Sequence, residues 1–464
     1  MATGRSGVAH VLTHRPFMVF AVTQAVSLFG DKLDYMALLA LFAWFSATLG
    51  VDSSRAISAL SVVAALPTIL FAPVAGVIVD RLDRRRLMLA CDSARAVLVG
   101  LVPVVAVGTG ALGPVFVVAF FVFLSGHLFQ SARMSIIPQL VDADAPPDPH
   151  LPGPVEQDLG PRRLLAANSF MNLIGRVATL AGMVLGGLIV DWSGWARCGI
   201  RPSWSAGFYI DGLSYVVSVA GLVLVYRRLG GFLPPPRPDA GPQTFLNAII
   251  RRAAHTWSDI HDAWRFAVRT PPVLFVYGSV MTLVTAGAAF LILYIPIIQG
   301  STETATLQMG TRGVGYFAAI GSVGLILSSV GYGLIGHHVR RETVIIACCA
   351  TLGGIAAVLP FVHHFGFVAP LAFIGGLAMT PIYIAMDTIL HESVPAETRG
   401  RVFSNREWVM HLAFALNALV IGQLTRFVDN RRLLFAVGAL VLAASAGGLF
   451  ALARVRRWYA ANGR

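Results

Sequence analysis

Long apolar runs recur along the whole chain and most constrain what it can fold into. Twelve of them are long enough for a helix to cross roughly 30 Å of hydrocarbon, which takes about 20 residues. They lie near residues 17–46, 56–79, 87–107, 112–137, 166–190, 206–226, 272–298, 313–336, 343–361, 367–390, 402–425 and 432–454. Inside a bilayer a run must satisfy its own backbone hydrogen bonds, and a helix does so. We therefore predict an all-α membrane protein with twelve transmembrane helices.

The composition excludes several soluble classes. Of the 464 residues, 56% are hydrophobic and 12% are charged, whereas a soluble domain carries about 25% charged residues. The net charge of +12 does not predict a nucleic-acid partner, because the Arg residues lie in short segments between apolar runs. The four Cys show neither a disulfide framework nor metal-ligand spacing. We find no catalytic or nucleotide-binding motif, so we expect no enzyme, metal or cofactor.

The Arg residues predict the orientation in the membrane. With the N-terminus in the cytoplasm, 23 of them fall in inside segments and seven in outside loops. Cytoplasmic loops carry an excess of Lys and Arg. We therefore expect a multi-pass protein of a bacterial inner membrane with both termini cytoplasmic.

The longest connection divides the runs into six and six. It predicts an N-terminal bundle at 1–226, a cytoplasmic linker at 227–270 and a C-terminal bundle at 271–464. The linker begins Pro-rich and continues as a basic amphipathic pattern, typical of a helix lying on the inner membrane surface. A second Pro-rich insert, at 142–160, is expected to be a loop whose role we cannot assign.

The two halves repeat each other. The stretch that ends the fourth run, 132–141, is similar to the stretch that ends the tenth run, 385–394. The stretches where the chain then re-enters the membrane, 167–169 and 404–406, are also similar. The turns after the second and eighth runs give a weaker third pair. A parallel duplication predicts two pseudo-symmetric six-helix bundles with a substrate site between them, near the bilayer midplane.

The second run ends in a charged motif, Gly76-Val-Ile-Val-Asp80-Arg81-Leu-Asp83-Arg84-Arg85-Arg86. Gly76 permits close helix approach, and Asp80 can accept from the N–H groups at a neighbouring helix N-terminus. Arg side chains such as Arg84 and Arg85 can bridge to carboxylates and lipid phosphates.

This motif resembles the loop 2–3 signature of the major facilitator superfamily, G-x-x-x-D-R-x-G-R-R, and the resemblance covers essentially the whole chain. Asp83 stands where that signature has Gly, and Asp tolerates a left-handed conformation better than most residues. The variant D-R-x-D-R-R is similar to the branch with macrolide-efflux permeases, siderophore exporters and lysophospholipid transporters. Residues 29–31 and 394–403 are similar to that branch too.

Two further patterns bear on export and coupling. Residues 182–187 are similar to the antiporter signature G-P-x-x-G-G, with Met183 in place of Pro, but small residues at this spacing also let helices pack. We favour packing, so export gains only modest support. His127 and Gln130 stand where the family has an Arg-x-x-Gln pattern linked to proton coupling, and His titrates near neutral pH.

The first run holds charges near its centre, at Asp31, Lys32 and Asp34. Each costs ~2.5–3.5 kcal/mol at the centre of a bilayer, so a lipid-facing position is implausible. Asp31 and Asp34 share a helix face, where mutual repulsion favours a proton on one of them. We predict that they border a wet cavity, with Arg176 as a counter-charge.

Other polar residues receive weaker assignments. Asp92 and Arg95 are expected near the inner surface, in a gate network of charges rather than at the substrate. That network also takes in Asp80, Arg81 and Arg133, and Asp387 is assigned to a matching network in the second half. Asp211 is expected to snorkel or to start a helix. Three polar residues inside the predicted spans could line the cavity: Asn168, Asn172 and His411.

Together these features predict a secondary transporter with alternating access between two bundles. Its expected substrate is an amphipathic or drug-like organic molecule, moved outward in exchange for protons. A lysophospholipid transporter of the same fold and an importer of a small nutrient remain alternatives. We expect a monomer surrounded by the lipid bilayer.

Overall fold

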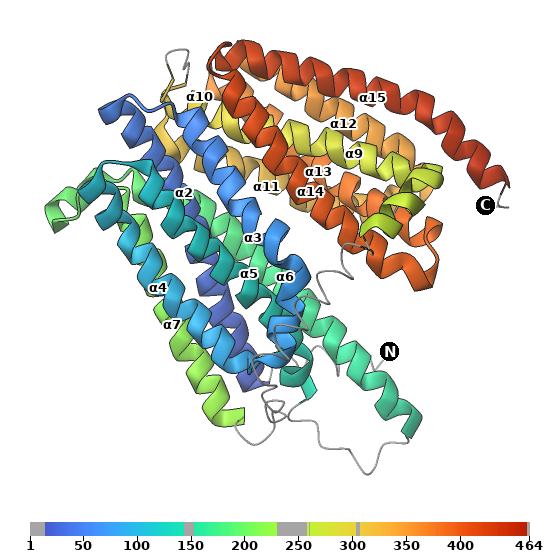
Figure 1. The fold of residues 1–464 in the computed structure, drawn as a ribbon, viewed down its shortest axis with the longest axis horizontal. Helices are drawn as coiled ribbons and strands as arrows, with labels where there is room; N and C mark the ends of the chain where they lie inside the picture. Colours follow the sequence, from blue (N-terminus) through green and yellow to red (C-terminus); the bar gives the residue numbers. More distant parts are fainter. Residues whose placement is uncertain (1–13, 143–152, 230–257, 259, 303–306, 462–464) are drawn as a thin grey trace. The chain divides into compact units, whose positions relative to one another are not determined.

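A computed structural model of the chain describes residues 14–142, 153–229, 258, 260–302 and 307–461. These residues contain helices and no strand (Figure 1). The long helices are α2 (Arg15–Leu49), α3 (Ser53–Arg81), α4 (Arg84–Thr109), α5 (Leu112–Asp142), α6 (Gly153–Val190), α7 (Ser205–Leu229), α9 (Pro271–Ala289), α11 (Gly310–Ile335), α12 (Arg341–Val358), α13 (Phe365–Ser393), α14 (Ala396–Leu424) and α15 (Asn430–Ala461). Residues 260–269, at the end of the predicted linker, are helical as well.

The helices agree with the predicted spans. In the described part, eleven helical segments are long and apolar enough to cross a membrane. The remaining predicted span is α2, a helix of 35 residues that carries Asp31, Lys32 and Asp34 in its interior. The all-α membrane fold predicted from the sequence is confirmed.

The Pro-rich insert differs from our expectation. We expected a loop over 142–160, but α5 continues to Asp142 and residues 153–160 form the first turns of α6. Pro154 is the second residue of this helix, where the missing N–H removes no helical bond. Residues 143–152 lie outside the described part, as do most of the residues assigned to the linker, 230–257 and 259.

The seventh span is interrupted. After α9 the chain makes a π-helical turn, Phe290–Tyr294, and then continues as α10 (Ile295–Gln299). Pro296 lacks an N–H, and in a regular helix its ring would press on the carbonyl four residues earlier. A wider turn relieves this conflict. The Phe290 ring stacks on Phe317 of α11, with ring centroids 4.7 Å apart.

Contacts within the chain group it into two units. The first takes residues 1–37 and 71–252, and the second takes 38–70 and 253–464, so α2 and α3 are each shared between them. In the first unit α4 packs against α5 and α7, and its core includes Phe17, Met88 and Phe129. In the second unit α11 packs against α13, and α12 against α15. The division of the chain at residues 227–270 stays a prediction.

Close packing of α11 against α13 depends on glycine. A Cβ at Gly376 would overlap with the backbone carbonyl of Gly321, and one at Gly324 would overlap with the carbonyl of Phe373. The two backbones therefore approach more closely than any larger residue allows, as small residues do at membrane helix interfaces.

We expect Gly376→Ala to destabilise the protein by about 1–3 kcal/mol, because the new methyl group meets backbone that cannot move aside. The adjacent Gly375→Ala is the matched control, since its Cβ would meet only the ends of two side chains, Ile355 at 3.6 Å and Leu352 at 4.0 Å. Thermal unfolding in detergent measures both variants. Equal melting temperatures for the two would contradict this account of the interface.

Candidate functional site

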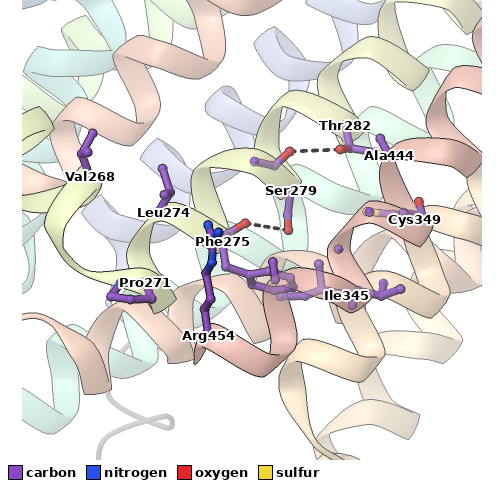
Figure 2. A pocket seen from close by; sticks show the side chains of 16 residues that line it. Val268, Pro271, Leu274, Phe275, Ser279, Thr282, Ile345, Cys349, Ala444 and Arg454 are labelled. Carbon is purple, nitrogen blue, oxygen red and sulfur yellow. Dashed lines mark hydrogen bonds between the residues drawn. The ribbon is translucent and has the colours of Figure 1, made fainter. Parts of the chain in front are cut away.

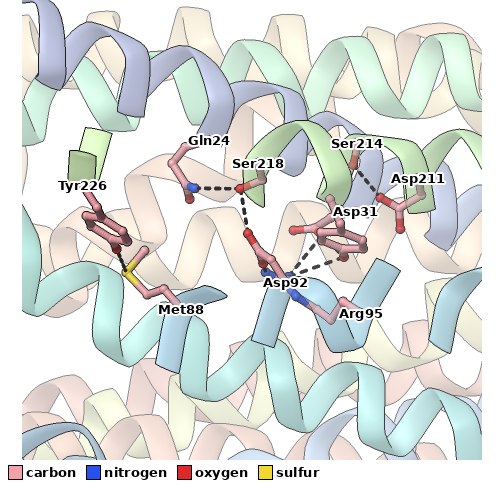
Figure 3. A network of polar contacts seen from close by, with 10 residues as sticks. Gln24, Asp31, Met88, Asp92, Arg95, Asp211, Ser214, Ser218 and Tyr226 are labelled. Carbon is pink, nitrogen blue, oxygen red and sulfur yellow. Dashed lines mark hydrogen bonds and ion pairs between the residues drawn. The ribbon is translucent and has the colours of Figure 1, made fainter. Parts of the chain in front are cut away.

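A network of buried polar side chains joins α2, α4 and α7 in the first unit (Figure 3). Tyr215 of α7 donates a hydrogen bond to Asp31 Oδ1 of α2, at 2.5 Å. Nη1 of Arg95, on α4, lies 3.6 Å from the same oxygen. The Asp31 side chain keeps 31% of its surface exposed, whereas Arg95 keeps 5%. Asp31 is thus the accessible end of a network whose cation is buried.

Arg95 holds this network together. It forms an ion pair with Asp92, one helical turn earlier on α4, and Asp92 is fully buried. Its guanidinium also lies over the rings of Tyr215 and Phe129, with centroids 4.3 and 4.7 Å away. Buried charges need both pairing and hydrogen bonds, and Arg95 has both.

A chain of two donors supports Asp92 at the carboxyl oxygen that does not pair with Arg95. The Ser218 hydroxyl donates to Asp92 Oδ2 at 2.6 Å, and the Gln24 amide donates to Ser218 Oγ at 3.4 Å. Gln24 lies on α2 and Ser218 on α7, so this chain ties both helices to α4 (Figure 3). Both carboxyl oxygens of Asp92 therefore have a partner in the interior of the unit.

Asp211 differs from our expectation. It lies fully buried in α7, seven residues into the helix, and neither snorkels nor starts it. Ser214 donates to Asp211 Oδ1 at 3.0 Å, and Oδ2 has no hydrogen-bond partner in the described part. A Cβ at Gly30 of α2 would overlap with both Asp211 and Ser214, so Gly30 is what lets α7 approach here.

The remaining charges of α2 take two different positions. Asp34 is buried, one turn beyond Asp31, with no hydrogen bond or ion pair to any described residue, and it lies within electrostatic reach of Asp31 and Asp211. Lys32 points toward α6, where a Cβ at Gly182 would lie 2.7 Å from the Lys32 Cβ and 2.6 Å from the Phe29 carbonyl. Gly182 thus serves helix packing, in line with the interpretation we favoured.

The counter-charge of Asp31 is not the predicted one. Arg95 lies beside Asp31, while Arg176 is exposed on α6 and makes no ion pair with Asp31 or Asp34 in the described part. We had assigned Asp92 and Arg95 to a separate group near the inner surface, and the structure joins them to Asp31. Arg133, on α5, is half-buried within electrostatic reach of Asp31 and Arg95.

The charged motif at the start of α4 links three helices. Asp83 caps α4 in an extended conformation and accepts from the Arg85 N–H at 3.0 Å, so it does not take up the left-handed conformation we considered. Arg84 donates to the Ser135 carbonyl of α5 at 3.2 Å, and the Arg85 guanidinium lies over the ring of Tyr226 on α7. The side chains of Gly76, Asp80 and Arg81 lie outside the described residues.

The second unit has its own ion pairs. Arg406 of α14 pairs with Asp387 of α13 and lies 2.7 Å from Glu407. Our prediction included Asp387 but not Arg406. Beside this cluster Tyr277 of α9 donates to Asn405 Oδ1 at 2.8 Å.

The other predicted cavity residues do not join either network. Asn168 and His127 are half-buried, on α6 and α5, and Asn172 is exposed on α6. His411 is half-buried on α14, where its Nδ1 lies 2.9 Å from the Glu407 carbonyl of the same helix. Their roles stay predictions. The described residues contain no group of three or more His, Cys, Asp or Glu placed to hold a metal ion.

Residues that our prediction missed form a stripe on α7. Asp211, Ser214, Tyr215 and Ser218 recur at intervals of three and four residues, which places them on one helix face. This spacing was visible in the sequence as a polar face on an otherwise apolar span. Its partners on α2 and α4 were not visible, since spacing within one helix does not say which helix that face meets.

A family model, that of the Major Facilitator Superfamily, matches residues 24–404 of the chain. The chain belongs to this superfamily. The multidrug efflux pump Tap of Mycolicibacterium fortuitum is 24% identical over 371 residues, which cover 79% of this chain and 80% of Tap. The lysophospholipid transporter LplT of Cronobacter sakazakii is 24% identical over 379 residues, 80% of each chain.

Solved structures of the superfamily share the fold. A crystal structure of a mutant peptide transporter POT aligns over 94% of this chain and 95% of its own, with a TM-score of 0.68 at 15% identity. The chain is therefore a multi-pass membrane transporter of the major facilitator fold rather than an enzyme, and its relatives are bacterial transporters.

Proposed function

We propose that this major facilitator protein exports amphipathic or drug-like organic molecules by alternating access, in exchange for protons. The observation that carries the proposal is the cluster of Asp31, Asp34, Asp92 and Asp211 around a single paired guanidinium, that of Arg95. The relatives named multidrug efflux pump and lysophospholipid transporter are consistent with an amphipathic substrate.

The charge balance of this cluster points to proton or cation binding. Four carboxyl groups lie within electrostatic reach of one another, and they outnumber the two guanidinium groups nearby, those of Arg95 and Arg133. Excess negative charge in a setting that excludes most water is costly. A bound proton offsets the excess, and so does a cationic substrate. Competition between the two for the same carboxylates is the simplest form of antiport, and the partly exposed Asp31 is the group best placed for it.

The location follows from the same proposal. We place the protein in the bacterial inner membrane with both termini in the cytoplasm, because the Arg residues concentrate in the segments that this orientation puts inside. Asp80, Arg81, Arg84, Arg85 and Arg133 are proposed to act at the cytoplasmic gate, and Asp387 with Arg406 in its counterpart. The protein is proposed to act as a monomer.

Transport in proteoliposomes tests the proposal. With a lipophilic cationic dye as substrate, we expect an imposed proton gradient to drive the dye against its own gradient, with protons moving the opposite way. Dye movement that ignores the proton gradient would exclude antiport. A second arm offers a labelled lysophospholipid in place of the dye: transport of the lysolipid without any transport of the dye would move the assignment to the lysophospholipid alternative.

A further inference from the structure

A groove of about 470 Å³ opens among α9, α12 and α15 of the second unit (Figure 2). It lies on three membrane-spanning helices and away from the polar clusters described above. Its walls are apolar or small, and they include Phe275, Gly278, Ile345, Cys349 and Gly447. This volume is in the range of small-molecule sites in proteins, roughly 300–1,000 Å³.

The hydroxyl groups that line the groove all donate hydrogen bonds to backbone carbonyls of their own helices. Ser279 donates to the Phe275 carbonyl at 2.9 Å, and Thr282 donates to the Gly278 carbonyl at 3.0 Å. Ser445, on the opposite wall, donates to the Val441 carbonyl at 2.8 Å. Each hydroxyl is thus satisfied by its own helix, and the space between the helices suits an apolar occupant.

One end of the groove is cationic. Arg454 lines it from α15, is exposed, and makes no ion pair or hydrogen bond with any described residue. No Asp or Glu is present among the residues that line the groove. The groove therefore combines an apolar trough with a single positive charge at its end, which is the complement of a molecule with an acyl chain and an anionic head.

The length of the groove matches one leaflet. Along α15 it extends from Ala444 to Arg454, a helical rise of ~15 Å. The hydrocarbon core of a bilayer is about 30 Å thick, so one leaflet contributes about 15 Å. An acyl chain lying in the groove would thus place its phosphate at the level of Arg454.

We propose that this groove is a binding site for one anionic phospholipid of the leaflet reached by the C-terminal end of α15. One acyl chain lies between α9, α12 and α15, and the lipid phosphate binds Arg454. The surrounding bilayer always contains such lipids. Glycines in the walls have no side chain that would narrow the groove, so an acyl chain has room to lie in it. A Cβ at Gly278 or Gly447 would meet no atom within 4 Å.

Native mass spectrometry of the purified protein tests the site, with phosphatidylglycerol and phosphatidylcholine titrated separately. The wild-type protein is expected to retain one phosphatidylglycerol in preference to phosphatidylcholine. Arg454→Gln is expected to weaken phosphatidylglycerol about fivefold and to remove the preference. Arg456→Gln is the matched control, because Arg456 is exposed on the same helix but does not line the groove. If the two substitutions have equal effects, general surface charge explains the preference for phosphatidylglycerol, and the proposed site is wrong.

A second pair of variants tests the trough itself. Gly447→Leu and Gly278→Leu each add a bulky side chain to a wall of the groove, at positions where a Cβ meets no neighbouring atom within 4 Å. Both are expected to lose the bound phospholipid of either kind. Gly354→Leu is the control, since its Cβ also meets open space but lies outside the groove. Undiminished binding by correctly folded Gly447→Leu and Gly278→Leu proteins would overturn the proposal.

Discussion

Asp31→Asn is expected to reduce proton-driven transport to the level of protein-free liposomes while leaving the fold intact. Asn cannot take up and release a proton, but it keeps an oxygen that can accept from Tyr215. Arg95 remains paired with Asp92, so no buried cation is left without a partner. Proton movement and substrate movement are measured in the same proteoliposomes, and exchange of substrate without a gradient is expected to persist.

Asp52→Asn serves as the matched control for this experiment. Asp52 accepts from the backbone N–H of Ser54 and Arg55 at the start of α3, at 2.8 and 3.2 Å. Asn is an equally good residue at such a position, so the same chemical change is expected to leave transport unaltered. Normal coupling in the Asp31→Asn protein would remove Asp31 from the proposed proton pathway.

Arg95→Gln is expected to be among the most destabilising substitutions in the first unit, by ~3–5 kcal/mol. It leaves Asp92 as a fully buried carboxylate without its cation and removes the guanidinium from between Tyr215 and Phe129. The apparent melting temperature in detergent and the yield of folded protein measure the effect.

Two further variants separate the charge from its surroundings. Arg86→Gln removes an Arg whose side chain is 88% exposed and whose partner, Asp83, lies as far away as 3.8 Å. Such an exposed pair contributes little, so we expect stability to change by at most ~1 kcal/mol. Replacing the pair together, as Asp92→Leu with Arg95→Met, is expected to recover part of the lost stability, because no unpaired charge remains. If Arg95→Gln melts like Arg86→Gln, the ion pair does not stabilise the unit as described.

The positions of the helices could be read from the sequence because the membrane imposes a simple rule. A run of about 20 apolar residues satisfies its own backbone only as a helix, and every predicted run coincides with helical structure. The rule fails where apolarity is absent, and for this reason we expected a loop at 153–160, where α6 in fact begins.

Part of the candidate site was also within reach of the sequence. Charges at Asp31 and Asp34 stand out in an apolar span because each is expensive there, and the structure places both in a polar cluster. Asp92 and Arg95 were assigned to one network of charges, and their spacing of three residues places them on one helix face. The stripe on α7 obeys the same spacing and could have been found in the same way.

The sequence by itself determined which apolar segments span the membrane as helices, that the first of them carries buried charges, and that the chain belongs among major facilitator transporters. Only the tertiary structure decided that Arg95, and not Arg176, accompanies Asp31, and that Asp211 faces α2. The physical reason is that helical periodicity fixes the direction of a side chain about its own axis. Its partner depends on how closely a neighbouring helix can approach, and here the missing side chain of Gly30 allows that approach.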